Sequence, residues 1–271
     1  IIPAVVVLIA GTMFIMWLGE KITDRGIGNG VSLIIMIGIV ARLPQALWVE
    51  AVSSNIILFI VELIFLALVF MLAIAIVQAV RRIPVQYAKR IVGNKQYGGV
   101  RQYIPLKLNA ANVMPIIFAQ ALMFIPGLIW PNVQAWQFNG WAYNVALVVM
   151  VIAFTFFYTA IIVNPQMMAD DMKRNGGFIP GVKPGKSTVK YIDDVMTRIT
   201  LPGSIFLALI TVLPAIAMTL GISQGFAYFF GGTSLLIMVG VVLDTLKQIE
   251  SYLLMRHYDG LMKTGRIQGR Y

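Results

Sequence analysis

Two short glycine-rich motifs contain the residue types that bind phosphate groups in other proteins. Within GVKPGKST, the GKS at residues 185–187 matches the end of a phosphate-binding loop, whose backbone N–H groups and lysine hold phosphate oxygens. The spacing does not match, because Pro180 occupies the position of the first glycine and Gly181 is one residue too close. No β-strand is expected before this loop, since a membrane span and a helical extension precede it. We therefore predict a basic surface loop in which Ser187 or Thr188 caps the next helix.

The motif GIGNG at residues 26–30 resembles a dinucleotide-binding turn, but it also lacks the preceding strand that such a site requires. Its glycines predict a structural role, because small residues allow a short helix to begin beside close neighbours in a membrane bundle. Neither glycine motif therefore predicts nucleotide binding.

Residue sets for catalysis or metal binding are scarce. The sequence has no cysteine, which excludes disulfides, thiolate catalysis and cysteine-ligated metal, and the single histidine, His257, leaves little for a histidine-based metal site. It contains no HExxH motif, no Ser/His set and no paired carboxylates in the middle of its apolar runs. The sequence gives no support for a membrane-embedded enzyme and predicts no cofactor.

Ion-coupled transport is also disfavoured. A transporter coupled to protons or ions normally carries ionisable residues near the bilayer midplane, where they bind the ion or relay the proton. The charged residues within or beside the apolar runs here are Glu62, Arg42 and Asp244, and each lies close enough to the end of a run to reach the interface. A polytopic solute permease is the alternative function that we keep.

The distribution of apolar residues indicates a membrane protein. Hydrophobic residues make up 59% of the chain and charged residues 12%, and the hydrophobic ones form long runs of the length that a helix needs to cross a bilayer. The prediction is an all-α polytopic transmembrane helix bundle. The predicted spans are residues 2–18, 31–43, 56–80, 113–130, 144–163, 199–220 and 226–243.

The segment 81–112 predicts the orientation of these spans. It contains seven Lys and Arg residues and no acidic residue, and such segments are retained on the cytoplasmic side. Residues 19–30, 164–198 and the tail 244–271 are then cytoplasmic as well. With this topology only Arg42 of the 21 Lys and Arg residues lies on the outer side, so the span count and the charge distribution support each other.

The same segment predicts a small β-hairpin. Apolar residues alternate through Ile83, Val85 and Tyr87, Gly93-Asn94 is a turn signal, and a second run passes through Tyr103. We expect two strands with a basic tip outside the bilayer.

Long stretches of the chain match a known family. They include WLGEKITDRGIGNGVSLIIMIGIVARLP, RRIPVQYAKR, IPLKLNAANVMPIIFAQALMFIP, VNPQMMADDMKRNGGFIPGVKPGKSTVKYIDDVMTRITLPG and FFGGTSLLIMVGVVLDTLKQIES. In these motifs the chain closely resembles the SecY family, whose members are the central subunits of bacterial protein-conducting channels. The seven predicted spans resemble the fourth to tenth of the family's ten. Because the chain starts without Met inside apolar sequence, we expect it to be the C-terminal part of a longer protein.

The resemblance implies a channel that passes unfolded polypeptides across the membrane and opens sideways to release hydrophobic segments into lipid. It implies no catalytic residue. In the family a ring of aliphatic side chains forms the constriction, and the lateral gate lies partly on the helix that matches residues 113–130 here. Gln120 is the polar residue of that span, and the two alternatives for it are a hydrogen bond across the closed gate to a helix outside this chain or one within the same bundle wall. The residues that match the constriction are Ile35, Ile117, Leu122 and Ile237.

The two large basic loops resemble the family's docking surface for a motor or ribosome. The matching residues are Arg90, Lys95, Arg101, Lys183 and Lys186. Lys183 replaces the arginine usual in the family's G-x-R-P-G pattern, which keeps the charge but loses the bidentate geometry of a guanidinium group.

The resemblance also implies partners and a location. The implied partners are SecE, SecG, the SecA motor, the ribosome, secretory and membrane-protein polypeptides, membrane lipid, and in addition SecDF and YidC. Contact with nucleic acid is implied only through the ribosome. The implied location is the bacterial cytoplasmic membrane, with a cytoplasmic C-terminus.

The topology is directly testable. In the full-length protein in intact cells, cysteines introduced at Asn94 and Ala135 should label from opposite sides with a membrane-impermeant thiol reagent, because seven cations hold residues 81–112 inside. Labelling of the Asn94 variant from outside would contradict the predicted topology.

Overall fold

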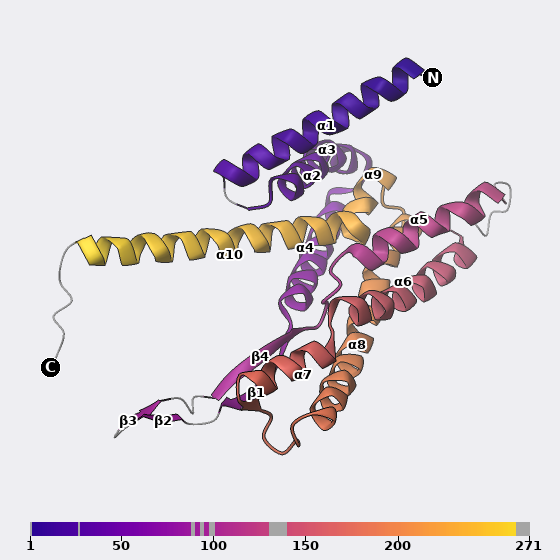
Figure 1. Ribbon diagram of the computed structural model, residues 1–271. Helices are drawn as coiled ribbons and strands as arrows, with labels where there is room; N and C mark the ends of the chain where they lie inside the picture. Colours follow the sequence, from indigo (N-terminus) through magenta and orange to yellow (C-terminus); the bar gives the residue numbers. More distant parts are fainter. Residues whose placement is uncertain are drawn as a thin grey trace.

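The protein folds as a bundle of apolar helices with a small antiparallel sheet at one end (Figure 1). The computed structural model describes residues 2–26, 28–87, 90–92, 95–97, 101–129 and 140–263, with backbone alone at residues 2, 90–92, 95–97, 101, 127 and 256–263. The helices are α1 (Ile2–Arg25), α2 (Gly30–Val40), α3 (Leu43–Ser53), α4 (Ile56–Gln78), α5 (Met114–Ile129), α6 (Trp141–Ile162), α7 (Pro165–Arg174), α8 (Lys186–Thr219), α9 (Gln224–Ala227), the 3₁₀ helix η2 (Tyr228–Phe230) and α10 (Gly232–Lys263). The strands are β1 (Val80–Tyr87), β2 (Arg90–Val92), β3 (Lys95–Tyr97), β4 (Arg101–Lys107) and β5 (Gly177–Phe178).

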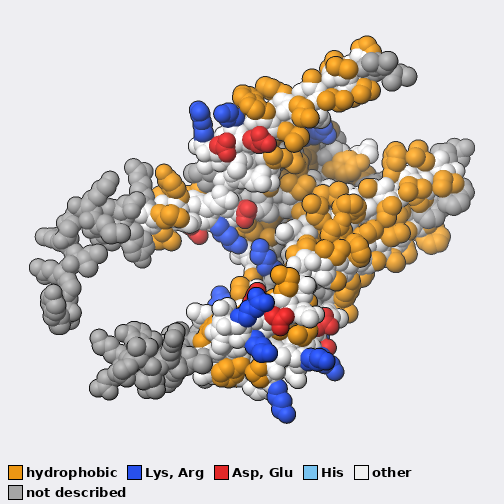
Figure 2. All heavy atoms as spheres, in the orientation of Figure 1, with side chains coloured by type: hydrophobic (Ala, Val, Ile, Leu, Met, Phe, Trp, Pro, Cys, Tyr) orange, Lys and Arg blue, Asp and Glu red, His pale blue; other side chains and the backbone are white. Residues whose placement is uncertain are grey.

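Six helical segments of the described chain are long and apolar enough to cross a membrane, and α5 is a shorter apolar helix of 16 residues. The predicted fold class, an all-α polytopic membrane bundle with a small β-hairpin, is confirmed. Figure 2 shows apolar side chains spread over α5, α6 and much of α1, while charged side chains gather over the sheet, α7 and the neighbouring end of α1. We call the end that carries the sheet the charged end.

Some element bounds differ from the predicted ones. α2 stops at Val40, and α3 occupies residues 43–53, a segment predicted as a loop. Pro44 lies in the first turn of α3, where its missing N–H costs no helical hydrogen bond, so this proline begins a second helix. α8 starts at Lys186 instead of residue 199, and α10 starts at Gly232 instead of residue 226.

The hairpin predicted within residues 81–112 is present and gains a third strand. β1 and β4 pair antiparallel from Val80↔Lys107 to Gln86↔Arg101, and β2 pairs with β3 farther out. The expected Gly93-Asn94 turn lies outside the described residues. On the other edge of β1, Gln86 pairs with Phe178 of β5, so the expectation that no strand precedes the Lys186 loop is wrong. A two-residue strand is too short to show the alternation by which strands are predicted.

A separate small core joins the two basic loops at the charged end. Ile83 and Val85 lie two residues apart on the buried face of β1, at 3% and 1% exposure. They pack with Met172 of α7 and with Ile192 and Met196 of α8. The loops that follow α4 and α6 therefore form one body, even though about a hundred residues separate their sequences.

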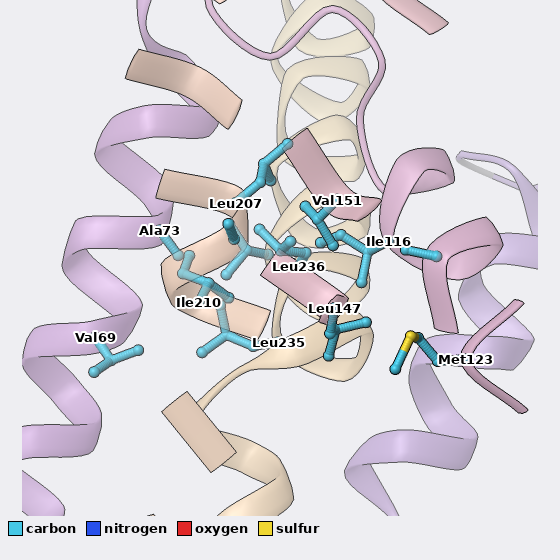
Figure 3. Packing of buried hydrophobic residues seen from close by; sticks show 13 residues of the cluster. Val69, Ala73, Ile116, Met123, Leu147, Val151, Leu207, Ile210, Leu235 and Leu236 are labelled. Atoms are coloured by element: carbon cyan, nitrogen blue, oxygen red, sulfur yellow. The ribbon is translucent and has the colours of Figure 1, made fainter. Parts of the chain in front are cut away.

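The bundle core contains aliphatic side chains from five helices (Figure 3). They are Val69 and Ala73 of α4, Ile116 and Met123 of α5, Leu147 and Val151 of α6, Leu207 and Ile210 of α8, and Leu235 and Leu236 of α10. By contrast, α1 leaves most of its apolar side chains exposed. Such a surface is unfavourable in water and indicates contact with hydrocarbon or with another protein segment.

The end of the bundle opposite the sheet is held together by a buried carboxylate. Glu50 of α3 is 1% exposed, and its Oε1 accepts a hydrogen bond from Ser54 Oγ at 2.8 Å. Its Oε2 accepts one from the backbone N–H of Ser223 at 3.1 Å, in the loop before α9. The bond from Ser223 fixes α3 to a segment far away in the sequence, and the local bond from Ser54 satisfies the other carboxylate oxygen.

Close contact between α1 and α2 depends on two glycines and a threonine. Thr23 Oγ1 donates to the Gly19 carbonyl at 2.9 Å and accepts from the Gly30 N–H at 2.8 Å. A Cβ added to Gly30 would meet the Gly19 carbonyl oxygen, which is backbone and cannot rotate away. The structural role predicted for the glycines of residues 26–30 is therefore confirmed at Gly30.

Two glycine substitutions within α2 test this contact. Gly30→Ala should destabilise the purified full-length protein by about 1–3 kcal/mol, because the new methyl group forces α1 and α2 apart. Gly38→Ala should be neutral or slightly stabilising, since a Cβ there meets nothing within 4 Å. Thermal unfolding in detergent measures both, and equal midpoints for the two variants would contradict the proposed contact.

Candidate functional site

Three of the predicted constriction residues lie around one cavity. Ile35 of α2, Ile117 of α5 and Ile237 of α10 all line a cavity of about 520 Å³ near the charged end, which we call the proximal cavity. These helices are far apart in the sequence. The motif-based prediction stays a prediction for the constriction itself, but the fold brings three of its four residues to the lining of one cavity.

The α5 helix shows how a membrane helix presents an aliphatic residue to a cavity. Ile116, Ala119 and Met123 recur at helical spacing and are buried in the bundle core. Ile117 is 43% exposed and belongs to the opposite side. The chain enters α5 through Asn112, which has a φ of 53°, a left-handed conformation that asparagine tolerates better than most residues.

The lining of the proximal cavity is partly polar. Lys107, Asp244 and Lys247 contribute to it together with Asn29 and Asn109. The sequence interpretation placed Asp244 at a span end that reaches the interface, whereas the structure makes it part of this lining. Asn109 was not predicted; it is 7% exposed, and its Oδ1 is buried without a hydrogen-bond partner.

A second cavity of about 1,010 Å³ lies toward the end opposite the sheet, between α2, α3, α9 and α10; we call it the distal cavity. Its lining includes Arg42, Gln45, Gln224 and Tyr228. Ile35 lines both cavities. The two cavities therefore share one aliphatic lining residue, and each also has polar residues in its lining.

The remaining two bundle residues named by the resemblance lie elsewhere on α5. Leu122 lines neither cavity, since five residues after Ile117 a helix has turned by about 140°. Gln120 is partly buried, and its Nε2 lies 4.0 Å from the place where a Cβ on Gly232 would be. Gln120 thus faces the start of α10.

The basic docking residues are only partly described. Lys183 and Lys186 are exposed at the charged end, and the Lys183 carbonyl accepts a hydrogen bond from Thr188 Oγ1 at 3.0 Å. The predicted cap by Ser187 or Thr188 is wrong, because Gly185 is the N-cap of α8 and its φ of 103° favours glycine. The backbones of three further residues lie in β2, β3 and β4, but their side chains lie outside the described residues; these are Arg90, Lys95 and Arg101.

A family model named SecY matches residues 1–246 of this chain. The chain belongs to the SecY family. A protein translocase subunit SecY from Streptomyces galbus is 44% identical over an alignment 279 residues long. This alignment covers 97% of this chain and 63% of the relative. The corresponding subunit from Chlamydia trachomatis serovar D is 42% identical over 291 residues, covering 99% of this chain and 64% of the relative. This SecY-family chain therefore spans less than two thirds of the length of these curated relatives.

Solved structures share the fold. A structure concerned with the plug domain of the SecY protein aligns with a TM-score of 0.60 at 18% identity, over 89% of this chain and 64% of that one. A structure of a protein conducting channel aligns with a TM-score of 0.58, also at 18% identity, over 89% of this chain and 63% of that one.

Substituted cysteines can map the cavity walls, because the native chain has no cysteine. In the full-length membrane-embedded protein, Ile35→Cys, Ile117→Cys and Ile237→Cys should react with a water-soluble maleimide, since the reactive thiolate forms where water reaches it. Ile57→Cys, on an exposed face of α4, should stay unlabelled in lipid. Leu122→Cys should react more slowly than Ile117→Cys, and the reverse order would contradict the cavity assignment on α5.

Proposed function

We propose that the full-length protein carrying this chain is the central subunit of a protein-conducting channel that translocates unfolded polypeptides and inserts membrane proteins. The observation that carries this proposal is a pair of partly polar cavities that share the aliphatic Ile35 in their linings, in a chain of the SecY family. Nothing in the comparisons favours the alternative of a solute permease.

The aliphatic side chains around Ile35 suit an unfolded polypeptide. Aliphatic side chains make no directional hydrogen bonds, so a collar of them can contact any residue that passes. A narrow apolar constriction also loses water readily and opposes ion flow while the path is closed. Ile35, Ile117 and Ile237 supply such a surface, and Leu122 remains a proposed fourth member.

We place the lateral gate partly on α5. This helix is apolar, only 16 residues long, and carries Gln120 toward the start of α10. In hydrocarbon a glutamine amide needs a hydrogen-bonding partner, and a gate helix belonging to the rest of the protein could supply it when the gate is closed. Release of that partner would open a path from the cavities to lipid.

The charged end is the proposed cytoplasmic docking surface for SecA or the ribosome. Its support is the small core that joins the two basic loops into one body, with Lys183 and Lys186 exposed on it. Charge complementarity would steer an acidic protein surface or ribosomal phosphate to this end. SecE, SecG, SecDF and YidC are proposed partners of the complete protein on the same grounds of family membership.

The constriction yields a sharp test. Ile237→Asn should raise the resting ion conductance of reconstituted full-length channels and admit substrates with defective signal sequences, because a polar side chain favours wetting of the closed path. The variant should still insert, since Ile237 lines a cavity. Single-channel recording and translocation assays measure the two effects.

Ile57→Asn is the matched control on a lipid-facing position. Ile57 is 75% exposed on α4, so its replacement should reduce accumulation without creating a leak, because asparagine is costly in hydrocarbon. If Ile237→Asn and the wild type conduct equally at matched protein levels, Ile237 does not belong to the constriction.

A further inference from the structure

Arg42 distinguishes the lining of the distal cavity. Among the described residues that line it, Arg42 alone carries a full charge, and the other polar groups are neutral. Its lining also includes the side chains of Gln45, Gln224 and Tyr228. The proximal cavity differs, because Lys107 and Lys247 are accompanied there by Asp244.

The guanidinium group of Arg42 is available to a ligand. Arg42 is exposed, and within the described part of the chain its side chain takes part in no hydrogen bond or ion pair. It lies between α2 and α3 as the N-cap residue of α3, so the positive end of that helix dipole lies beside it. Both contributions make this wall of the distal cavity positive.

The acidic residues of this end do not cancel the charge at the cavity surface. Glu50 is almost completely buried and accepts hydrogen bonds from Ser54 and Ser223, and Glu62 belongs to α4. Neither lines the distal cavity. A group that enters the cavity therefore meets the arginine directly and the carboxylates only through the wall.

We propose that Arg42 is a charge-selective residue of the polypeptide path, which favours acidic segments and slows basic ones in the distal cavity. This inference rests on the proposed channel function. A chain that passes Ile35 leaves a cavity of mixed charge and enters a positive one. Arg42 then attracts Asp and Glu carboxylates and repels Lys and Arg, with no need for a particular sequence around them.

The expected size follows from Coulomb's law. Two unit charges about 6 Å apart, in surroundings between bulk water and a half-hydrated cavity, change an equilibrium by roughly threefold to tenfold. An effect of this size alters rates of transit without blocking any substrate. It should also decrease as added salt screens the charges.

The test uses the full-length protein with its natural partners and three forms of one secretory substrate. The forms carry a tract of six Lys, six Glu or six Gln at the same place. For each channel variant, the transport rate of the Lys or Glu substrate is divided by that of the Gln substrate, which gives the Lys:Gln and Glu:Gln ratios. Arg42→Gln should raise the Lys:Gln ratio by about threefold to tenfold, and Arg42→Glu should lower the Glu:Gln ratio. Arg198→Gln, which removes an exposed cation of α8 that lines neither cavity, should leave both ratios at the wild-type value.

The outcomes separate this inference from the function on which it rests. Ratios that stay within twofold of the wild type in Arg42→Gln would overturn the role of Arg42, while transport of the Gln substrate would still support the channel. Failure of the wild type to transport all three substrates would overturn the channel itself. If the Arg42 variants do not accumulate, the wild-type Lys:Gln ratio of transport rates is compared at low and high salt instead. A ratio that does not change with salt refutes the proposal.

Discussion

The inability of hydrocarbon to hydrogen-bond with a polypeptide is the constraint on which this structure depends. Backbone groups at membrane depth must pair within the chain, so the long segments are helices and the sheet is confined to the charged end. The same constraint determines where polar side chains can lie. Asn29, Asp244 and Arg42 line cavities between helices, and Glu50 is buried with hydrogen-bond partners.

Isoleucine shows how little residue type alone reveals about such a bundle. Ile116 is buried in the core, Ile117 lines the proximal cavity, and Ile57 lies on an exposed face of α4. The three side chains are chemically identical, and the helical spacing of the core residues separates only the first from the others. The resemblance to the SecY family could select Ile117 because it carries positional information that hydrophobicity does not contain.

The presence of membrane spans and the unequal distribution of charge could be predicted, because each signal is the sum of contributions from many residues. Twenty apolar residues in a row or seven cations in a loop are strong signals, whereas β5 depends on two residues and a partner strand about ninety positions away. The start of α3 at Leu43 was not predicted from the sequence, because Pro44 suggests the end of a helix. Proline also suits the first turn of a helix, which is where Pro44 lies. Cavities are harder still, since the proximal one combines side chains of α2, α5 and α10 that no local pattern connects.

The two cavities share two helices, and this limits how the proposed path can be built. α2 and α10 contribute to both; α5 adds to the lining of the proximal cavity, and α3 with α9 to that of the distal one. α2 is positioned at one end by the Gly19–Gly30 contact with α1, and α3, which follows it, is fixed by the Glu50 hydrogen bond to Ser223. Ile35 lies on the helix between these two fixed points. The position of Ile35, which both cavities share, therefore depends on polar contacts at both ends of the bundle.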